Sequence, residues 1–574
     1  MTSHATRGQG TRRARGGHDG RRPSPSPGTD RVPGWDGGFN AGLRTVVNAS
    51  TRTGGTLRFA RTDDLDSLDP GDTYYAYVWN LLRLVGRTLL TYQPLPGRAG
   101  QQLVPDLATS LGAAGDGGRT WTYRLRRGVT FEDGTPVTAH HVKYAIQRSS
   151  FAPERLSGGP TYFRRYLDGP DAIRTPDAHT LVFHLREPFA MFDYLVTLPG
   201  TAPVPPEHDT GGGAATGPPA TGPYRVHRYR RGERLELARN PRWRPVTDPL
   251  RRQLADRVVV DLGVDGHTVD ERLLAGEVDV DLAGVGVQPA TLARILAEPA
   301  LRARADNPLI GFTWMYGINA RVPPFQDIHC RRAVQHATDK AGMQAAYGGP
   351  AAGDIATTIL PPTIDGYRPF DRYPCGPDGR GDAEAARAEL AAAGMPEGFR
   401  TRIAAREDRL KEFAAAHALR ASLATVGIQA EVLGFRSGDY FDRYAGVPAY
   451  LHANGIGIVM FGWGADFPDG FGFLDQIVNG RAVKPAGNHN FAEVDLPEVN
   501  ALLDLGARTA GPARRAGIWG EIDRLVMEDA SICPYLYAKS LLYRGPRATN
   551  VYVSGAYGMY DYVSLGVAEV QPGT

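Results

Sequence analysis

Short runs of alternating apolar and polar residues recur along the chain, and each predicts a strand of a half-buried sheet. In residues 54–60, Leu57 and Phe59 fall on one face of the predicted strand. Residues 121–125 alternate in the same way, and residues 457–461 form a short continuous apolar run that is typical of a buried strand.

Helical patterns alternate with the predicted strands, and this alternation indicates the fold class. The strand of residues 257–262 is followed by a short helix at 268–275 and by another strand at 276–281. A longer helix at 410–426 leads through Gly427 into a further strand. Strands that are connected by crossover helices predict an α/β fold.

The length of 574 residues predicts two or three domains, because one hydrophobic core stops growing well below this size. Apolar residues make up 42% of the chain and charged residues 22%, as in soluble globular proteins. No run of about 18 apolar residues is present, so the sequence predicts no transmembrane helix.

Residues 1–51 differ in composition from the rest of the chain. They are rich in Gly, Arg, Ser and Pro and poor in aliphatic residues, so we expect a disordered tail. Arginine pairs at 12–13 and 21–22 suggest export, but neither the apolar segment of a signal peptide nor a lipoprotein cysteine follows them. We therefore expect either a solvated arm or a mis-assigned start codon.

The distribution of charge argues against nucleic acid as a partner. The chain has 65 basic and 62 acidic residues, and residues 1–50 hold eight arginines and three aspartates. The remainder has 57 basic and 59 acidic residues, which is a net charge of −2. The predicted folded body therefore lacks the basic surface of a nucleic-acid binder.

The three cysteines, Cys330, Cys375 and Cys533, show neither a CxxC pair nor a Cys/His spacing, so we expect no structural zinc site. A disulfide between Cys330 and Cys375 is one option that the spacing leaves open.

Residues 461–478, FGWGADFPDGFGFLDQIV, combine several features of a ligand site. They begin at the end of a predicted buried strand, where Gly462 and Gly464 flank Trp463. Glycines leave backbone donors and acceptors uncovered, Trp463 adds an apolar face, and Asp466 adds a negative charge. Together these groups suit a ligand with a peptide-like backbone and a positive end.

A second interpretation of the same residues is purely structural. The strand would turn a tight corner, and Asp466 would cap a helix that begins near Gly470.

The loop of residues 62–77 carries five aspartates. It lacks the glycine and terminal glutamate of an EF-hand, so we expect no calcium site there. We expect a solvated loop that faces a ligand, followed by aromatic residues that pack or line a pocket.

Sequence motifs of common enzymes are absent. The chain has no Walker loop, no GxGxxG after a strand, no GxSxG and no HExxH. Carboxylate pairs such as Asp466 and Asp469 are compatible with acid–base chemistry, but any large protein offers such pairs.

Several longer patterns carry a family resemblance. The longest is residues 103–148, LVPDLATSLGAAGDGGRTWTYRLRRGVTFEDGTPVTAHHVKYAIQR, and shorter ones are LDSLDP, TGPYRV, GEVDVD and NARVPPFQDIHCRRAVQHATDK. From residue 52 to near the C-terminus, the chain resembles the family 5 extracellular solute-binding proteins of bacterial ABC importers, the oligopeptide and dipeptide binders.

The resemblance implies a periplasmic-binding-protein-like fold of the class II type. Two α/β lobes would be joined by crossing strands, would include an extra domain, and would close around the ligand by a hinge motion. The ligand would lie between domains I and III. The implied segments are 52–83, 221–312 and 515–574 for domain I, 84–220 for domain II, and 313–514 for domain III.

The resemblance also assigns site residues. In peptide-binding relatives, an aspartate in a G-W-x-x-D pattern pairs with the α-ammonium group of the peptide, and Asp466 fits this pattern. Backbone groups from Gly462 to Gly464 would bond to the peptide main chain as an added strand. The other residues that would line the site are Trp463, Asn319, Thr73 and Tyr74.

By the same resemblance, the protein would have no catalytic residues, metal or cofactor. It would be a monomeric receptor that delivers a peptide to a membrane permease and its ATPase. Relatives carry a signal peptide and commonly a lipid-modified cysteine. Neither is visible here, so an extracytoplasmic or membrane-associated location is expected from the resemblance alone.

Three alternatives stay open. The same fold would suit a non-peptide solute, such as a nickel chelate, haem, a sugar or an opine. The missing export signal would suit a ligand sensor in the cytoplasm. A hydrolase is the third alternative, and turnover of a bound peptide would distinguish it.

Overall fold

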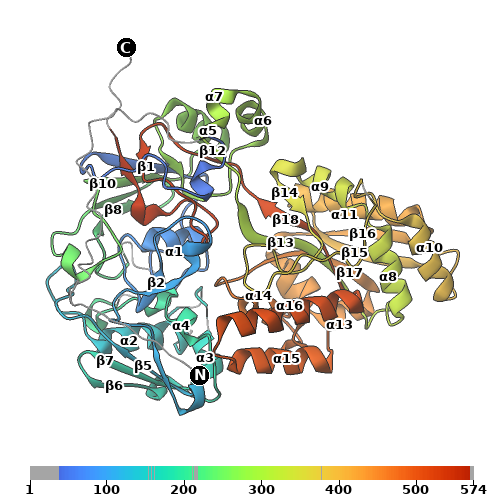
Figure 1. The fold of residues 1–574 in the computed structure, drawn as a ribbon, viewed down its shortest axis with the longest axis horizontal. Coiled ribbons are helices and arrows are strands. Elements are labelled where there is room, and N and C mark those ends of the chain that lie inside the picture. Colours follow the sequence, from blue (N-terminus) through green and yellow to red (C-terminus); the bar gives the residue numbers. More distant parts are fainter. Residues whose placement is uncertain are drawn as a thin grey trace, which may run out of the picture. The chain divides into compact units, whose positions relative to one another are not determined.

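The computed structural model describes residues 38–568, apart from residues 153, 157, 161, 210, 212–216 and 377. The first 37 residues of the predicted tail thus lie outside the described part. Within that part, helices pack on three larger sheets (Figure 1).

The first sheet has the order β11-β1-β10-β9-β8 and contains the predicted N-terminal strand. In β1, Leu57 and Phe59 are fully buried, as the alternation predicts. α5 (Gly266–Ala275), which is capped by Asp265, leads from β10 to β11 and confirms the predicted β-α-β unit. The strands are β1 (Thr56–Ala60), β8 (Tyr224–Arg230), β9 (Arg234–Arg239), β10 (Arg257–Asp261) and β11 (Val280–Asp281).

The second sheet is antiparallel, with the order β4-β5-β7-β6. α2 (Ala139–Ser150) begins after Thr138 and buries Val142 and Ile146 completely. The strands are β4 (Ala113–Gly115), β5 (Thr120–Arg124), β6 (Ile173–Asp177) and β7 (Thr180–His184).

The third sheet is mixed, with the order β14-β18-β13-β17-β15-β16. α11 (Leu410–Ala424) connects the parallel strands β15 and β16, which confirms the predicted helix-to-strand unit. The strands are β13 (Leu309–Ile318), β14 (Gly353–Ile355), β15 (Arg400–Arg406), β16 (Gln429–Phe435), β17 (Ile456–Gly464) and β18 (Ile532–Lys539). The other helices of this part include α8 (Ile328–Ala337), α10 (Ala383–Ala392), α14 (Gly470–Val478), α15 (Pro497–Arg508) and α16 (Pro512–Asp529).

Two neighbouring segments connect the part of the chain that contains the first sheet to the third sheet (Figure 1). β12 (Ala305–Asp306) pairs with β19 (Leu542–Tyr543), and directly beyond them β13 pairs with β18. The register of β13 against β18 shifts between Leu309 and Thr313, which is the irregularity of a β-bulge. Two extended crossings with a bulge provide the geometry that a hinge requires.

The domain boundaries stay predictions, but the sheet order differs from them at one end. Residues 515–574 were expected to belong to domain I, whereas β18 lies between β13 and β14 in the third sheet. The chain leaves this sheet only after Lys539.

Residues 38–51, expected to belong to the disordered tail, pack against the folded body. Val47 is fully buried and forms two backbone hydrogen bonds with Val551, of 2.8 and 3.0 Å. The polar composition of the tail as a whole concealed this one apolar anchor.

The three cysteines are free and buried, so the possible disulfide between Cys330 and Cys375 is not formed. Burial raises the pKa of both thiols to about 11. They therefore remain protonated and unreactive at neutral pH.

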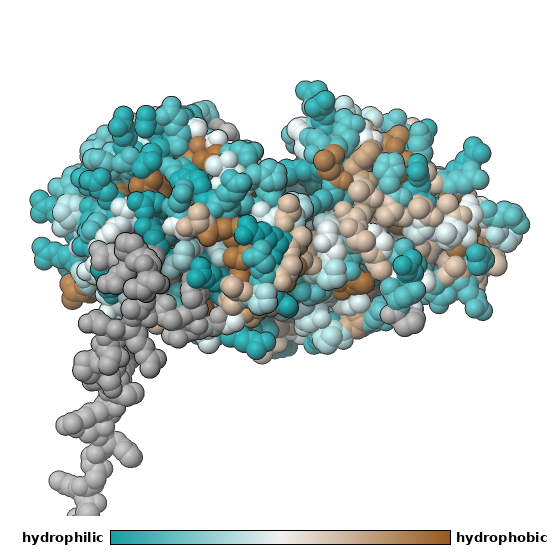
Figure 2. All heavy atoms as spheres, turned by 90° about the horizontal axis from the view of Figure 1, so that it is seen from above, coloured by the Kyte–Doolittle hydropathy of each residue, from teal (hydrophilic) through white to brown (hydrophobic). Residues whose placement is uncertain are grey.

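No helix of residues 38–568, outside the gaps given above, is long and apolar enough to cross a membrane. The face seen in Figure 2 is mainly hydrophilic, with apolar side chains in small separate groups.

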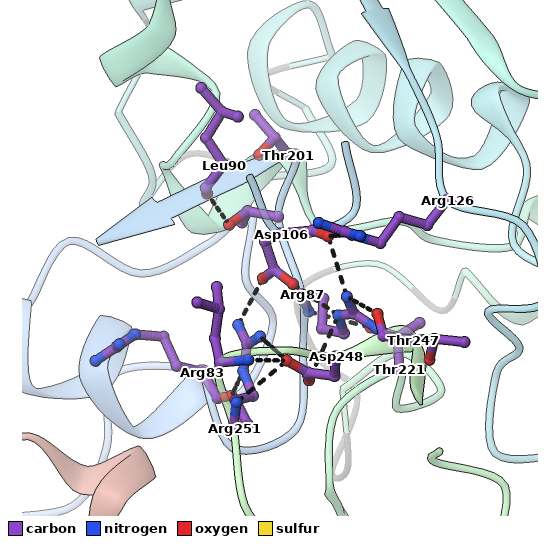
Figure 3. A network of polar contacts seen from close by, with 12 residues as sticks. Arg83, Arg87, Leu90, Asp106, Arg126, Thr201, Thr221, Thr247, Asp248 and Arg251 are labelled. Atoms are coloured by element: carbon purple, nitrogen blue, oxygen red, sulfur yellow. Dashed lines mark hydrogen bonds and ion pairs between the residues drawn. The ribbon is translucent and has the colours of Figure 1, made fainter. Parts of the chain in front are cut away.

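A cluster of buried charges connects Arg87 and Asp106 to the segment between β9 and β10, which carries Asp248 and Arg251 (Figure 3). The guanidinium of Arg87 donates to Asp106 over 2.7 Å, and that of Arg251 donates to the other carboxylate oxygen over 2.6 Å. Asp248 lies 3.6 Å from Arg87 and 3.3 Å from Arg251. These two arginines and two aspartates are at most 4% exposed, and their charges cancel. Although burial favours the neutral acid, Arg251 and Arg87 hold the pKa of Asp248 far below its usual value.

Candidate functional site

The candidate site lies where β17 ends and the chain turns into α14. Residues 456–461 are buried, as the apolar run predicts, and the strand then reaches Gly462, Trp463 and Gly464. α14 begins at Gly470, and its cap is Asp469, whose carboxylate accepts from the backbone N–H of Phe471 over 3.0 Å. The expectation that Asp466 caps this helix is therefore wrong, which leaves the Asp466 carboxylate available for another role.

Asp466 binds two tyrosine hydroxyls from distant segments. The hydroxyl of Tyr74, just before α1 (Ala76–Leu82), donates to Asp466 Oδ2 over 2.8 Å. The hydroxyl of Tyr162, at the start of α3 (Tyr162–Tyr166), donates to the same oxygen. Asp466 forms no ion pair with any described residue within 4.0 Å.

The protonation of Asp466 reflects this environment. Burial raises the pKa of its carboxyl, and the two tyrosine hydroxyls only partly offset this effect. A partly buried carboxylate that has no cationic partner among the described residues is suited to bind a positively charged group.

A cavity of about 90 Å³ adjoins Asp466. The start of α1, the end of β2 (Leu90–Tyr92) and the C-terminal segment around Tyr557 meet there. The aromatic residues that line it are Tyr74, Trp79, Tyr92 and Tyr557.

The free edge of β17 is the second element of the site. One edge pairs with β13 along the strand, from Ile458 opposite Ile318 to Gly464 opposite Phe312. The other edge pairs with β15 only as far as Val459. Residues 460–464 thus have no strand partner on that side among the described residues, which is the arrangement that an added peptide strand requires.

The comparison with protein families decides the identity of the fold. The model of the bacterial extracellular solute-binding proteins, family 5 Middle, matches residues 102–484, about two thirds of the chain. The chain belongs to this family.

Other family 5 proteins show how far the similarity extends. A solved structure, clavulanic acid biosynthesis oligopeptide binding protein 2, is 46% identical, with a TM-score of 0.89 over 93% of this chain and 99% of that one. The probable D,D-dipeptide-binding periplasmic protein DdpA of Escherichia coli (strain K12) is 26% identical over 84% of this chain and 88% of its own. Heme-binding protein A of Haemophilus influenzae (strain ATCC 51907 / DSM 11121 / KW20 / Rd) is 25% identical over 79% of this chain and 82% of its own. The predicted family and the predicted binding-protein fold are thereby confirmed.

Gly462 and Gly464 have a packing role that the sequence analysis did not anticipate. A Cβ on Gly462 would lie 2.2 Å from Phe312 Cε1 and 2.6 Å from Trp314 Cε3. A Cβ on Gly464 would lie 2.9 Å from Phe312 Cδ2. The glycines therefore let aromatic rings of β13 lie across β17, in addition to leaving its backbone uncovered.

Gly462→Ala is expected to destabilise the protein by about 1–3 kcal/mol, because the new methyl group must displace the rings of Phe312 and Trp314. Gly438→Ala is the matched control, since a Cβ there meets no atom within 4 Å. Urea unfolding measures both free energies of unfolding. Equal stability of the two variants would contradict this packing role.

Trp463 lies beside the free edge of β17. It is half-buried, stands opposite Thr313 of β13, and its ring centroid is 5.2 Å from that of His489. Its indole Nε1 is buried and has no hydrogen-bond partner in the structure. These features place an aromatic face and an unused donor near Asp466.

Asn319 is not brought together with Asp466. It follows β13 at the end remote from Gly464, about 17 Å along the strand from the Gly462–Trp314 pair. Its side chain is fully buried and donates to the Phe491 carbonyl over 3.1 Å and to Glu493 Oε1 over 2.8 Å. These bonds give Asn319 a structural role in place of the expected ligand contact.

Thr73 and Tyr74 differ in position although they are adjacent. The Thr73 hydroxyl donates to Asp66 over 2.9 Å, and the Thr73 carbonyl accepts from the Trp79 indole over 3.0 Å. Thr73 is fully buried, and its hydrogen bond holds the indole of Trp79 in place. Tyr74 is 47% exposed and reaches Asp466 directly.

Sequence reasoning missed Tyr162, which meets Asp466 across 304 positions of the chain. It also did not single out Tyr557, which lines the Asp466 cavity. No local pattern marks either tyrosine, because each becomes a site residue only through tertiary packing.

Proposed function

We propose that this family 5 protein is a receptor that binds peptides for an ABC importer. It holds the peptide in the site around Asp466 and delivers it to a membrane permease outside the cytoplasm. It carries out no reaction on the peptide and acts as a monomer. Family membership supports the binding role, and two of the three relatives described above are named for peptide ligands.

The observation that carries the proposal is the Asp466 carboxylate. It is partly buried, and among the described residues it binds the hydroxyls of Tyr74 and Tyr162 and has no cationic partner within 4.0 Å. The α-ammonium group of a peptide supplies the positive charge that this site lacks and further hydrogen-bond donors to the carboxylate. The free edge of β17 is positioned to bond the main chain that follows the ammonium group.

The hinge gives this binding a mechanical consequence. Tyr74 and Tyr162 precede the crossing segments in the chain, whereas Asp466 follows β13 and belongs to the part built on the third sheet. A ligand that contacts both parts stabilises the arrangement in which they are close, so binding shifts the hinge equilibrium toward closure.

The direct test is isothermal titration of the purified protein with a pool of short peptides and with the same pool after N-acetylation. We expect binding of the free-amine pool and a large loss on acetylation, because acetylation removes the charge that pairs with Asp466. Native mass spectrometry identifies any ligand that is retained from the cell. Retention of one non-peptide compound, together with no binding of either pool, would overturn the proposal.

The affinity for free-amine peptides is expected to be lower at about pH 5 than at about pH 7, because the α-amino group stays protonated over this range while a larger fraction of Asp466 is protonated at the lower pH. Burial raises the pKa of Asp466, so this loss occurs at a higher pH than for a surface aspartate. Titrations at both pH values with free and acetylated peptides measure the effect. A free-amine affinity that is the same at both values would contradict the role of the charge.

A further inference from the structure

A second cavity, of about 130 Å³, lies against the one at Asp466. Trp79, Thr197 and Tyr557 line both cavities, so these side chains form the boundary between them. We call the second cavity the inner chamber. Most of its wall is apolar, and includes Leu68, Pro70, Leu82, Val85, Ala202 and Val226.

The volume of the inner chamber limits what it can hold. A cavity of about 150 Å³ accommodates one benzene-sized group, so this chamber has room for one side chain and not for a main-chain segment. Because it adjoins the Asp466 cavity, a side chain near the amino end of a bound peptide is the group within reach.

Charges in the wall discriminate between possible side chains. Arg83 and Arg251 line the inner chamber, but Arg83 pairs with Asp561 over 2.9 Å and Arg251 pairs with Asp106 over 2.6 Å. Figure 3 shows Arg251 within the buried charge cluster. These two positive charges are therefore already neutralised.

Glu132 is the charged residue of the wall that has no such partner. It forms no ion pair within 4.0 Å with any described residue, and one of its carboxylate oxygens is buried without a hydrogen bond. Burial raises the pKa of Glu132, and the more distant Arg225 only partly counteracts this. The wall thus presents an apolar surface with one carboxylate that forms no ion pair with any described residue.

We propose that the inner chamber is a specificity subsite for a ligand side chain with an apolar body and a positively charged end, as in lysine. This rests on the proposed function. Trp79, Tyr557 and the aliphatic wall contact the methylene groups, and Glu132 binds the ammonium group. An acidic side chain is rejected there, because it would place like charges together in a confined space.

Gly86 offers a way to close the inner chamber without disturbing Asp466. It lines the chamber, and its φ is not positive. A Cβ there would meet only Leu82 O at 3.5 Å and Ala202 Cβ at 3.7 Å, which are ordinary contacts. Gly86→Leu therefore fills part of the space, while Glu132→Gln removes the charge and keeps the shape.

The test is isothermal titration of the full-length protein with tripeptides of a single series. The first or the second residue is lysine, norleucine, glutamate or alanine, and the other residues are alanine. At one of the two positions, we expect norleucine to bind about tenfold more tightly than alanine, and lysine about tenfold more tightly than norleucine. Glutamate is expected to bind no better than alanine.

The two variants separate the contribution of the Glu132 charge from that of the apolar space in the chamber. Glu132→Gln is expected to abolish the difference between lysine and norleucine, and Gly86→Leu to reduce both to the level of alanine. Trialanine binding and the thermal unfolding temperature serve as controls and are expected to stay unchanged in both variants.

Two results would overturn the subsite, and they differ in their bearing on the function. If trialanine binds but the four side chains are equivalent at both positions, or if Gly86→Leu weakens all peptides alike, the subsite is excluded and the receptor function stands. If no peptide binds, including trialanine, the receptor function fails and the subsite fails with it.

Discussion

Asp466→Asn is expected to weaken the binding of peptides with a free amino terminus by about 100-fold. Removing one partner of a buried, hydrogen-bonded charge pair costs about 2–5 kcal/mol, and each 1.4 kcal/mol corresponds to about a factor of ten in affinity. Asparagine keeps the shape of the side chain and one acceptor for the hydroxyls of Tyr74 and Tyr162, so we expect the fold to persist. Isothermal titration with a free-amine peptide measures the loss.

Two comparisons assign the loss to the ammonium contact. Binding of the N-acetylated peptide, already weak, is expected to change by less than about threefold, because it never used the charge of Asp466. Asp171→Asn removes an exposed carboxylate elsewhere and is expected to have no effect on either ligand. Equal losses for the free and acetylated peptides would exclude the assigned role.

Tyr162→Phe provides a finer measure of the same site. It removes one of the two hydroxyls that bind Asp466 but keeps the charge. We therefore expect its effect on free-amine peptides to be several times smaller than that of Asp466→Asn.

Asp106→Ala is expected to reduce the free energy of unfolding by about 3–5 kcal/mol, because it leaves Arg87 and Arg251 buried with one carboxylate fewer. Both guanidinium groups bind Asp106, and both lie in the buried charge cluster (Figure 3). Chemical denaturation followed by tryptophan fluorescence measures the change. A loss below about 1 kcal/mol would show that water or rearrangement replaces the missing charge.

Glu431→Gln is the matched control for this cluster. Glu431 pairs with Arg402 over 2.9 Å, but both side chains are about half exposed, so the expected cost is at most about 1 kcal/mol.

Acidification probes the same cluster without a mutation. The pKa of Asp248 is depressed in the folded protein, so its stabilising contribution is present above the unfolded value near pH 4 and is lost as pH falls below it. Denaturation curves recorded across that range are expected to show this loss.

The sequence by itself determined the elements whose cause is local. The alternation of Leu57 and Phe59 correctly predicted which face of β1 is buried. Periodicity is sufficient there, because it depends on the geometry of a single strand or helix. The family was likewise evident from the order and length of the motifs, and Asp466 was singled out as a charge beside glycines and a tryptophan.

Within the same stretch, sequence reasoning could not assign each residue its role. Asp466 and Asp469 both precede a helix, and only the path of the turn makes Asp469 the cap. Gly462 suggested an uncovered backbone, whereas its closest constraint is the ring of Phe312 on a neighbouring strand. Asn319 belonged to a convincing motif, but the antiparallel register of β13 and β17 carries it away from Asp466.

Only the tertiary structure decided which side chains contact Asp466 and which residues form the inner chamber beside its cavity. Tyr162 and Asp466 are 304 residues apart. The inner chamber is assembled from separate segments between Leu68 and Arg251 and from Tyr557. The physical reason is that periodicity predicts only which face of a helix or strand is buried. Residues that are close in the sequence determine this face together. A specific contact between distant side chains depends instead on how complete elements pack, which a local pattern does not encode.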